Sequence, residues 1–182
     1  LAFTMHMLSW LAVDGTAAIV EFPGVLYRGA AEAKIRQYLV ENNYVDAVIQ
    51  LPPDLFFGTQ ITTCIIVLKK SKQDNSVLFV DASKQFVREG NKNKLSAANQ
   101  EMILETLAKR VDIDHVAALV SAEAIRENGF NLSVSSYVEA EDTREEVDIV
   151  ELNARIKEIV ERQAVLRASI DEIVADLEGG AR

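Results

Sequence analysis

The 182-residue sequence has one cysteine, three prolines and two histidines. A single cysteine cannot form a disulfide within the chain, so we expect Cys64, which lies in an apolar run, to be a small core residue. A reducing cytoplasm fits this composition. His115 has no His, Cys or carboxylate partner at the spacing of a zinc site, so we expect no metal site.

The sequence also has no long uninterrupted hydrophobic run. Residues Leu1 to Val13 are apolar, but this stretch is too short and is interrupted by His6, so it does not predict a membrane span. It also lacks the basic start and small-residue cleavage site of a signal peptide. It does read as a helix without an N-cap, and we therefore expect it to have been cut out of a larger domain.

Positive charge is scarce, and its distribution matters more than the net charge of −9. The first 100 residues carry ten Lys/Arg and nine Asp/Glu, whereas residues 101–182 carry nine and nineteen. Binding to phosphates needs clustered Lys/Arg side chains. The second half is therefore a poor candidate for a DNA-binding surface, whereas the charge of the first half is compatible with one.

The stretch from Thr16 to Lys70 predicts a sheet with a crossover helix. Short apolar runs bounded by Gly and Pro predict strands, and Ile35, Tyr38 and Leu39 recur at helical spacing. The connection before the third run has only about ten residues, which favours an antiparallel pairing. The expected elements are a strand at Thr16–Phe22, a helix at Ala31–Glu41, and strands at Val45–Leu51 and Thr62–Leu68.

The next segment predicts shorter elements in a more polar setting. Ser96 is a plausible N-cap, and Met102, Ile103 and Leu107 share one face of the helix that follows it. We expect a strand at Val77–Val80, an exposed basic loop at Lys84–Leu95, a helix at Ser96–Arg110, a short strand at His115–Val120, a helical turn from Ser121 to Asn128-Gly129, and an extended connector at Phe130–Val138.

The last third predicts one long helix. Thr143 and Glu146 form an S/T-x-x-E capping box, and Gly179-Gly180 supplies a stop. Apolar residues recur in steps of three and four, with one polar interruption, which is the seam of a left-handed coiled coil. A helix of roughly 50 Å is longer than its own domain needs, so packing against other subunits is favoured over folding back on itself. The seam consists of Ile149, Leu152, Ile156, Ile159, Gln163, Leu166, Ile170, Ile173 and Leu177.

Several ordered segments together resemble the modification subunit of type I restriction-modification systems. They are FPGVLYRG, AEAKIRQYLVENNYVDAVIQLPPDLFFGT, ITTCIIVL, VLFVDAS, NKNKL and FNLSVSSYV. The resemblance implies a carboxyl-terminal fragment of an adenine-specific DNA methyltransferase that uses S-adenosylmethionine. The fold expected is α/β, the distal half of a Rossmann-like methyltransferase sheet plus a long coiled-coil helix. The expected domains are a partial methyltransferase domain at 1–95, a helical and extended connector at 96–142, and the assembly helix at 143–182.

The resemblance also implies catalytic features that this sequence lacks. Members of the family hold the adenine amino group with an Asn/Asp-Pro-Pro-Tyr/Phe motif, but Leu51-Pro52-Pro53-Asp54 has leucine at the position of the acceptor. The glycines Gly15, Gly24, Gly29 and Gly58 form no G-x-G cluster between a strand and a helix. We therefore expect no catalytic and no cofactor-binding residue in this chain.

Candidate DNA-contacting residues lie on three segments. In related adenine methyltransferases, the loop between the last two strands places an aromatic residue against the extruded base, and here it contains Phe56, the better match by position, and Phe57. Arg28, Lys92 and Lys94 are candidates for contacts with phosphate. The plainer alternatives are that both phenylalanines belong to the core, that Lys92 and Lys94 are simply solvated, and that Arg28 caps the edge of the sheet.

The partners implied by the resemblance are a specificity subunit, a second modification subunit, a restriction subunit and double-stranded DNA, with no membrane. Exposed apolar surface near Leu1–Leu11 and Thr16–Phe22 predicts that the chain self-associates. The runner-up function is a non-catalytic α/β interaction module that dimerises through its last helix. The sequence encoded upstream of Leu1 distinguishes the two, because only the methyltransferase requires a Pro-Pro-aromatic motif and a glycine-rich motif there.

Overall fold

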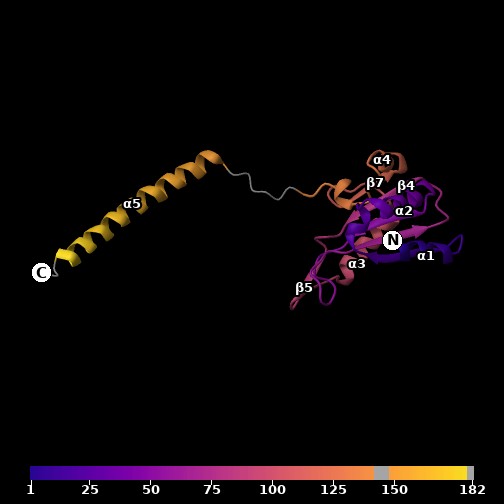
Figure 1. Cartoon of the computed structure of the whole chain (residues 1–182), viewed down its shortest axis with the longest axis horizontal. Coiled ribbons are helices and arrows are strands. Elements are labelled where there is room, and N and C mark those ends of the chain that lie inside the picture. Colours follow the sequence, from indigo (N-terminus) through magenta and orange to yellow (C-terminus); the bar gives the residue numbers. More distant parts are fainter. Residues whose placement is uncertain (142–147, 180–182) are drawn as a thin grey trace. The chain divides into compact units, whose positions relative to one another are not determined.

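The computed structural model describes residues 1–141 and 148–179. The chain divides into two compact units, Leu1–Glu141 and Asp142–Arg182, and Figure 1 follows their elements along the sequence. The boundary that we expected at residue 95 falls inside the first unit, because the segment after it contributes a strand to the sheet. Among the described residues, no helix is long and apolar enough to cross a membrane.

The first unit is built on a five-stranded mixed sheet in the order β1-β3-β2-β4-β7. β3 is antiparallel to both of its neighbours, and β2 is parallel to β4, so β1, β2 and β4 all run in one direction. β7 closes the far edge in antiparallel orientation. The strands are β1 Thr16–Glu21, β2 Val45–Gln50, β3 Cys64–Lys69, β4 Ser76–Asp81 and β7 Ala117–Ser121.

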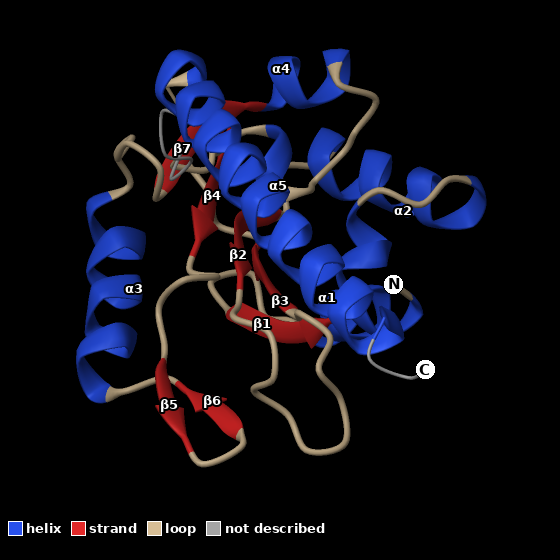
Figure 2. Cartoon of the chain, turned by 90° about the vertical axis from the view of Figure 1, so that its left-hand side faces the viewer, coloured by secondary structure: helices blue, strands red, loops and turns tan. Residues whose placement is uncertain are grey.

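Helices cover both faces of this sheet, as Figure 2 shows. On one face, α1 (Ala2–Trp10), α2 (Ala30–Glu41) and α4 (Ala122–Glu127) pack with Phe79 of β4 in the larger core cluster. On the other face, α3 (Ala97–Lys109) places Ile103 against a second cluster. The result is a three-layer α/β fold, which confirms the fold class expected from the sequence.

Serine side chains cap the amino-terminal ends of two helices. Ser96 accepts a hydrogen bond from the backbone N–H of Asn99, whose side chain in turn accepts one from the Ser96 N–H, a reciprocal pair at the start of α3. Ser121 caps α4 through the N–H of Ala124. The sequence predicted Ser96 as an N-cap and a helical turn starting at Ser121, and in both places Ser satisfies a backbone donor that the first helical turn leaves free.

Two expectations were wrong. Within residues 84–95, expected to be a loop, the chain forms a hairpin of β5 (Val87–Glu89) and β6 (Lys92–Lys94), with Gly90 in the left-handed region at φ 61°. The segment from Phe130 to Val138 is not a mere connector. It contains a 3-10 turn, η2 (Val134–Ser136), buries apolar side chains in the core, and stacks Tyr137 on Phe79 with ring centroids 4.3 Å apart.

β1 is more exposed than its apolar sequence suggested. Its residues alternate between exposed and half-buried positions, and within the described residues only β3 pairs with it. Val20 and the neighbouring Phe22 remain exposed, as do Phe3 and Trp10 on α1. This edge of the sheet therefore presents both unpaired backbone groups and apolar side chains.

The second unit contains α5, which runs from Ile149 to Gly179 and confirms the long carboxyl-terminal helix. The side chain of Asp148 accepts hydrogen bonds from the N–H groups of Val150 and Glu151, so Asp148 caps the helix. The predicted capping box at Thr143 and Glu146 lies outside the described residues. All nine seam residues are exposed on α5.

Candidate nucleic-acid interface

Three segments follow the carboxyl ends of the three parallel strands. Residues 22–29 follow β1, residues 51–63 follow β2, and residues 82–95 follow β4. Ligands of open α/β sheets bind beyond this end of the strands, in the crevice formed by such segments. The predicted DNA-contacting residues all lie on these three segments, so the fold brings them to one end of the sheet.

The segment after β2 carries two exposed aromatic rings. Phe57 is 100% exposed and Phe56 is 42% exposed, so neither is a buried core residue. Gly58, at φ 78°, lets the chain turn directly after them. Between Leu55 and Thr62 little of the loop packs on the core, and Leu55 alone contributes to a core cluster. Two rings held out toward solvent at this end of a sheet form a surface suited to stacking on bases.

Asp54 connects residues 55–62, the aromatic loop, to the β5–β6 hairpin. One of its carboxylate oxygens accepts from Nη1 of Arg88 at 2.7 Å, and the other accepts from Nζ of Lys92 at 2.9 Å. The Asp54 side chain is only 13% exposed and its backbone has φ 61°, in the left-handed region. The hydrogen bonds from Lys92 and Arg88 hold the pKa of the Asp54 carboxyl below its usual 3.8.

Backbone contacts complete the connection. Asn93, which is buried, donates from its side chain to the carbonyl of Pro53 at 2.8 Å and from its backbone N–H to the carbonyl of Asp54 at 3.0 Å. Lys92 also donates to the carbonyl of Phe56 at 3.0 Å. Sequence reasoning missed Asp54 and Asn93, because the groups that they join lie 34 to 40 positions apart.

The predicted phosphate contacts are less free than the sequence suggested. Lys92 is committed to Asp54 and to the aromatic loop, and Lys94 pairs with Glu89 at 2.8 Å on the surface of the hairpin. Arg28 lies over the ring of Phe22, 5.4 Å from its centroid. Lys92 therefore lies beside Phe56, whereas Arg28 stands on the separate segment after β1.

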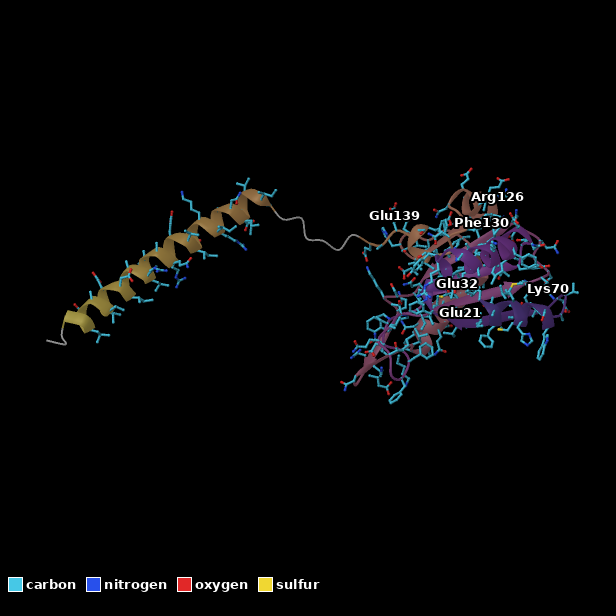
Figure 3. All side chains as sticks on the ribbon, viewed as in Figure 1. Glu21, Glu32, Lys70, Arg126, Phe130 and Glu139 are labelled. Carbon is cyan, nitrogen blue, oxygen red and sulfur yellow. The ribbon has the colours of Figure 1, made fainter. Side chains whose placement is uncertain are left out.

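A buried arginine holds the segment after β1 in place. The guanidinium of Arg36, from α2, donates to the carbonyls of Val25 at 2.9 Å, Arg28 at 2.7 Å and Phe130 at 2.9 Å. Arg36 is 2% exposed, and its burial lowers the pKa of the guanidinium, a shift that nearby Glu32 opposes. Figure 3 labels Glu32 and Phe130. Arg36 thereby fixes the backbone around Arg28.

Cys64 and His115 make structural contacts within the first unit. Cys64 is fully buried in β3, and burial raises the pKa of its thiol to about 12, so it is not a nucleophile at neutral pH. The ring Nδ1 of His115 lies 3.1 Å from the carbonyl of Glu139, which Figure 3 also labels. Among the described residues, no group of three or more His, Cys, Asp or Glu side chains is placed to hold a metal ion.

Comparisons with known proteins place this fold. The family model described as N-6 DNA Methylase matches residues 1–146. The chain is 46% identical over 178 residues to the type I restriction enzyme MpnII methylase subunit of Mycoplasma pneumoniae, covering 97% of this chain and 33% of that protein. It is 34% identical to the MjaVIII methylase subunit of Methanocaldococcus jannaschii, covering 86% of this chain and 29% of the relative.

Solved structures agree with these sequence relatives. The type I restriction-modification methyltransferase subunit of Streptococcus thermophilus superimposes with a TM-score of 0.74 and 45% identity, covering 76% of this chain and 30% of that one. The EcoKI M protein matches at a TM-score of 0.60 and 15% identity, which shows the fold alone. The chain spans about a third of the length of the first two curated relatives. The chain belongs to the N-6 DNA methylase family.

Proposed function

We propose that this chain is the carboxyl-terminal part of the DNA adenine N-6 methyltransferase subunit of a type I restriction-modification system. Its 46% identity to one methylase subunit over nearly its whole length carries the proposal. The exposed aromatic loop at the carboxyl ends of the parallel strands supports it. We propose a cytoplasmic location, since the only cysteine is buried and reduced.

Methyl transfer to adenine requires the target base to leave the duplex, because its amino group cannot be reached within the stack. In our proposal, Phe56 packs against the extruded adenine and Phe57 stands beside it at the tip of the loop. Stacking of this kind contributes about 1 to 3 kcal/mol per base. Arg28, Lys92 and Lys94 lie on the flanking segments and add positive charge near the phosphates.

The acceptor for the adenine amino group must come from elsewhere in the longer protein. At Leu51-Pro52-Pro53-Asp54 the carbonyl of Pro53 already accepts from Asn93, and both carboxylate oxygens of Asp54 are engaged by cations. Leu51 also has no side-chain acceptor at the position where the family's motif carries Asn or Asp, so this motif cannot hold the amino group as the family does. We therefore assign the catalytic acceptor to the rest of the longer protein.

S-adenosylmethionine supplies the methyl group in this proposal, but the described residues do not fit that cofactor. A Cβ added at Gly24 would meet the Phe22 ring at 2.6 Å, so this glycine allows close packing of Phe22 and Arg28 and leaves no open cradle. Gly29 and Gly58 begin no strand-to-helix turn of the G-x-G type. We assign cofactor binding to the rest of the longer protein.

We propose that α5 docks this chain to a specificity subunit and a second modification subunit, within an assembly that also takes up a restriction subunit and double-stranded DNA. Its seam is exposed, aliphatic except at Gln163, and regular over more than four heptads, and such a seam is stable only when other helices cover it. Without those partners, the exposed residues of α1 and β1 favour self-association.

The proposal is tested by Phe56→Ala in the complete, assembled methyltransferase. We expect slower methyl transfer on fully paired DNA, and a smaller loss when the target adenine lies opposite a mismatch, where extrusion costs less. Phe3→Ala is the matched control, because Phe3 is also an exposed phenylalanine but lies on α1. An unchanged ratio of rates on paired and mismatched DNA, with a stability loss of about 3 to 5 kcal/mol, would indicate a core role instead.

A further inference from the structure

The aromatic loop makes few packing contacts or hydrogen bonds within itself that would fix its conformation. Phe57 projects fully into solvent, Ile61 is also exposed, and the turn at Gly58 has an open surrounding. Within the loop, the N–H of Ile61 is satisfied only locally, by the hydroxyl of Thr59. A segment with few buried apolar contacts opens at low free-energy cost unless polar contacts hold it.

The contacts that do hold it converge on Asp54. Its carboxylate accepts hydrogen bonds from Arg88 and Lys92 of the hairpin at the base of the loop. The ammonium of Lys92 also donates to the carbonyl of Phe56. Arg88 also donates to the Asn93 side chain at 3.0 Å, so the same residues brace one another. Charge-assisted hydrogen bonds of 2.7 to 2.9 Å are among the stronger and more directional polar contacts.

We propose that Asp54 is a positioning residue that joins the aromatic loop and the β5–β6 hairpin into one rigid body, which engages duplex DNA as a unit. The inference rests on the proposed methyltransferase function and deepens it. Asp54 touches neither base nor phosphate. It sets where Phe56 stands by fixing Lys92, whose ammonium holds the backbone of the ring-bearing residue.

The charges in this body suit a phosphate-rich partner. Residues 84–94 contain four Lys/Arg and one Glu, so they remain positive after the contribution of Asp54, in a chain with a net charge of −9. Asp54 neutralises only one of its two cations. Removing its charge would therefore strengthen non-specific attraction to DNA, even as the loop loses its brace.

Asp54→Asn separates positioning from simple electrostatics. It keeps the size of the side chain but removes the charge that holds two cations. Glu89→Gln is the matched control, because it removes one negative charge from the same hairpin, at an exposed pair with Lys94, and leaves the loop contacts intact. Each variant loses one negative charge, so its net charge rises by one. Both should therefore bind DNA at least as tightly as the parent and with a steeper salt dependence.

The first measurement is amide hydrogen exchange of this chain at Asn93, whose N–H donates to the carbonyl of Asp54 where the loop meets the hairpin. We expect exchange to accelerate roughly tenfold or more in Asp54→Asn and to stay unchanged in Glu89→Gln. The second is methyl transfer by the complete assembled enzyme, where Asp54→Asn should lower kcat by about tenfold or more without weakening DNA binding, and Glu89→Gln should leave kcat unchanged.

Two results would overturn the inference. Unchanged exchange in Asp54→Asn would show that the carboxylate does not hold the loop, whatever happens to activity. Equal effects of the two variants on kcat would show that charge alone matters. If exchange accelerates but both Asp54→Asn and Phe56→Ala methylate normally, the loop has no part in the reaction, and that result counts against the proposed base contact itself.

Discussion

Arg36→Met should destabilise the first unit by about 3 kcal/mol, because three backbone carbonyls lose a charged donor. Methionine fills most of the volume of the arginine stem, so the cost comes from the carbonyls of Val25, Arg28 and Phe130 rather than from a cavity. The Val25 bond is buried and should cost most, whereas the other two acceptors are partly buried and can recover some hydration. Arg36→Lys should recover part of the loss, since an ammonium cannot reproduce the planar fork.

Urea unfolding of the whole chain measures this difference, and Arg126→Met is the matched control. Arg126 lies on the surface of α4 and is labelled in Figure 3. Exposed substitutions of this kind usually change the free energy of unfolding by less than about 0.5 kcal/mol. A loss below about 1 kcal/mol for Arg36→Met would refute the view that this guanidinium holds residues 22–29 in place.

Three further predictions concern assembly and pH. Gln163→Leu should raise the thermal stability of the assembled α5 helices, by on the order of 1 to 2 kcal/mol, and loosen partner choice; equal melting curves and equal pairing would place the residue outside a seam. The isolated chain should sediment as more than a monomer over a wide concentration range, and a strictly monomeric profile would contradict this. The pKa of Asp54 is lowered by Lys92 and Arg88, so its contribution to stability is fully present above the usual value of 3.8 and is lost as pH falls through the lower folded value. The deficit of Asp54→Asn in urea unfolding should therefore vanish in strong acid.

Much of the fold could be predicted from local sequence. The strands β2, β3 and β4 are apolar runs with turn residues nearby, and Pro52-Pro53 marks the end of β2 as expected. The antiparallel pairing of β2 and β3 followed from the short connection between them. Such features depend on residues within one segment, where periodicity and turn chemistry are direct guides.

Features that depend on distant contacts could not be predicted in this way. Apart from Val87, the strands of the β5–β6 hairpin consist of polar and charged residues, so no hydrophobic alternation marked them as two strands. Leu132 and Val138 are spaced too irregularly to indicate burial, although both lie in the core. Arg36 reaches a carbonyl 94 positions away, and no sequence pattern connects the two.

The candidate site shows the same division. The resemblance pointed to Phe56 and Phe57, and both are exposed on the segment between β2 and β3. Lys92 and Lys94 were candidates for contacts with phosphate, and in the structure each pairs with a carboxylate. Ion pairing of this kind depends on three-dimensional neighbours. The sequence of a polar segment does not distinguish a paired basic residue from an unpaired one.

The measurement that tests the account most directly is fluorescence of 2-aminopurine placed at the target adenine in duplex DNA bound to the complete assembled enzyme. Extrusion from the stack raises its emission, and stacking on an aromatic ring lowers it again. The account predicts that Phe56→Ala increases the emission of the bound complex at saturating enzyme, while Phe3→Ala leaves it equal to that of the parent. Identical emission from the Phe56→Ala and parent complexes would contradict the placement of this loop against the extruded base.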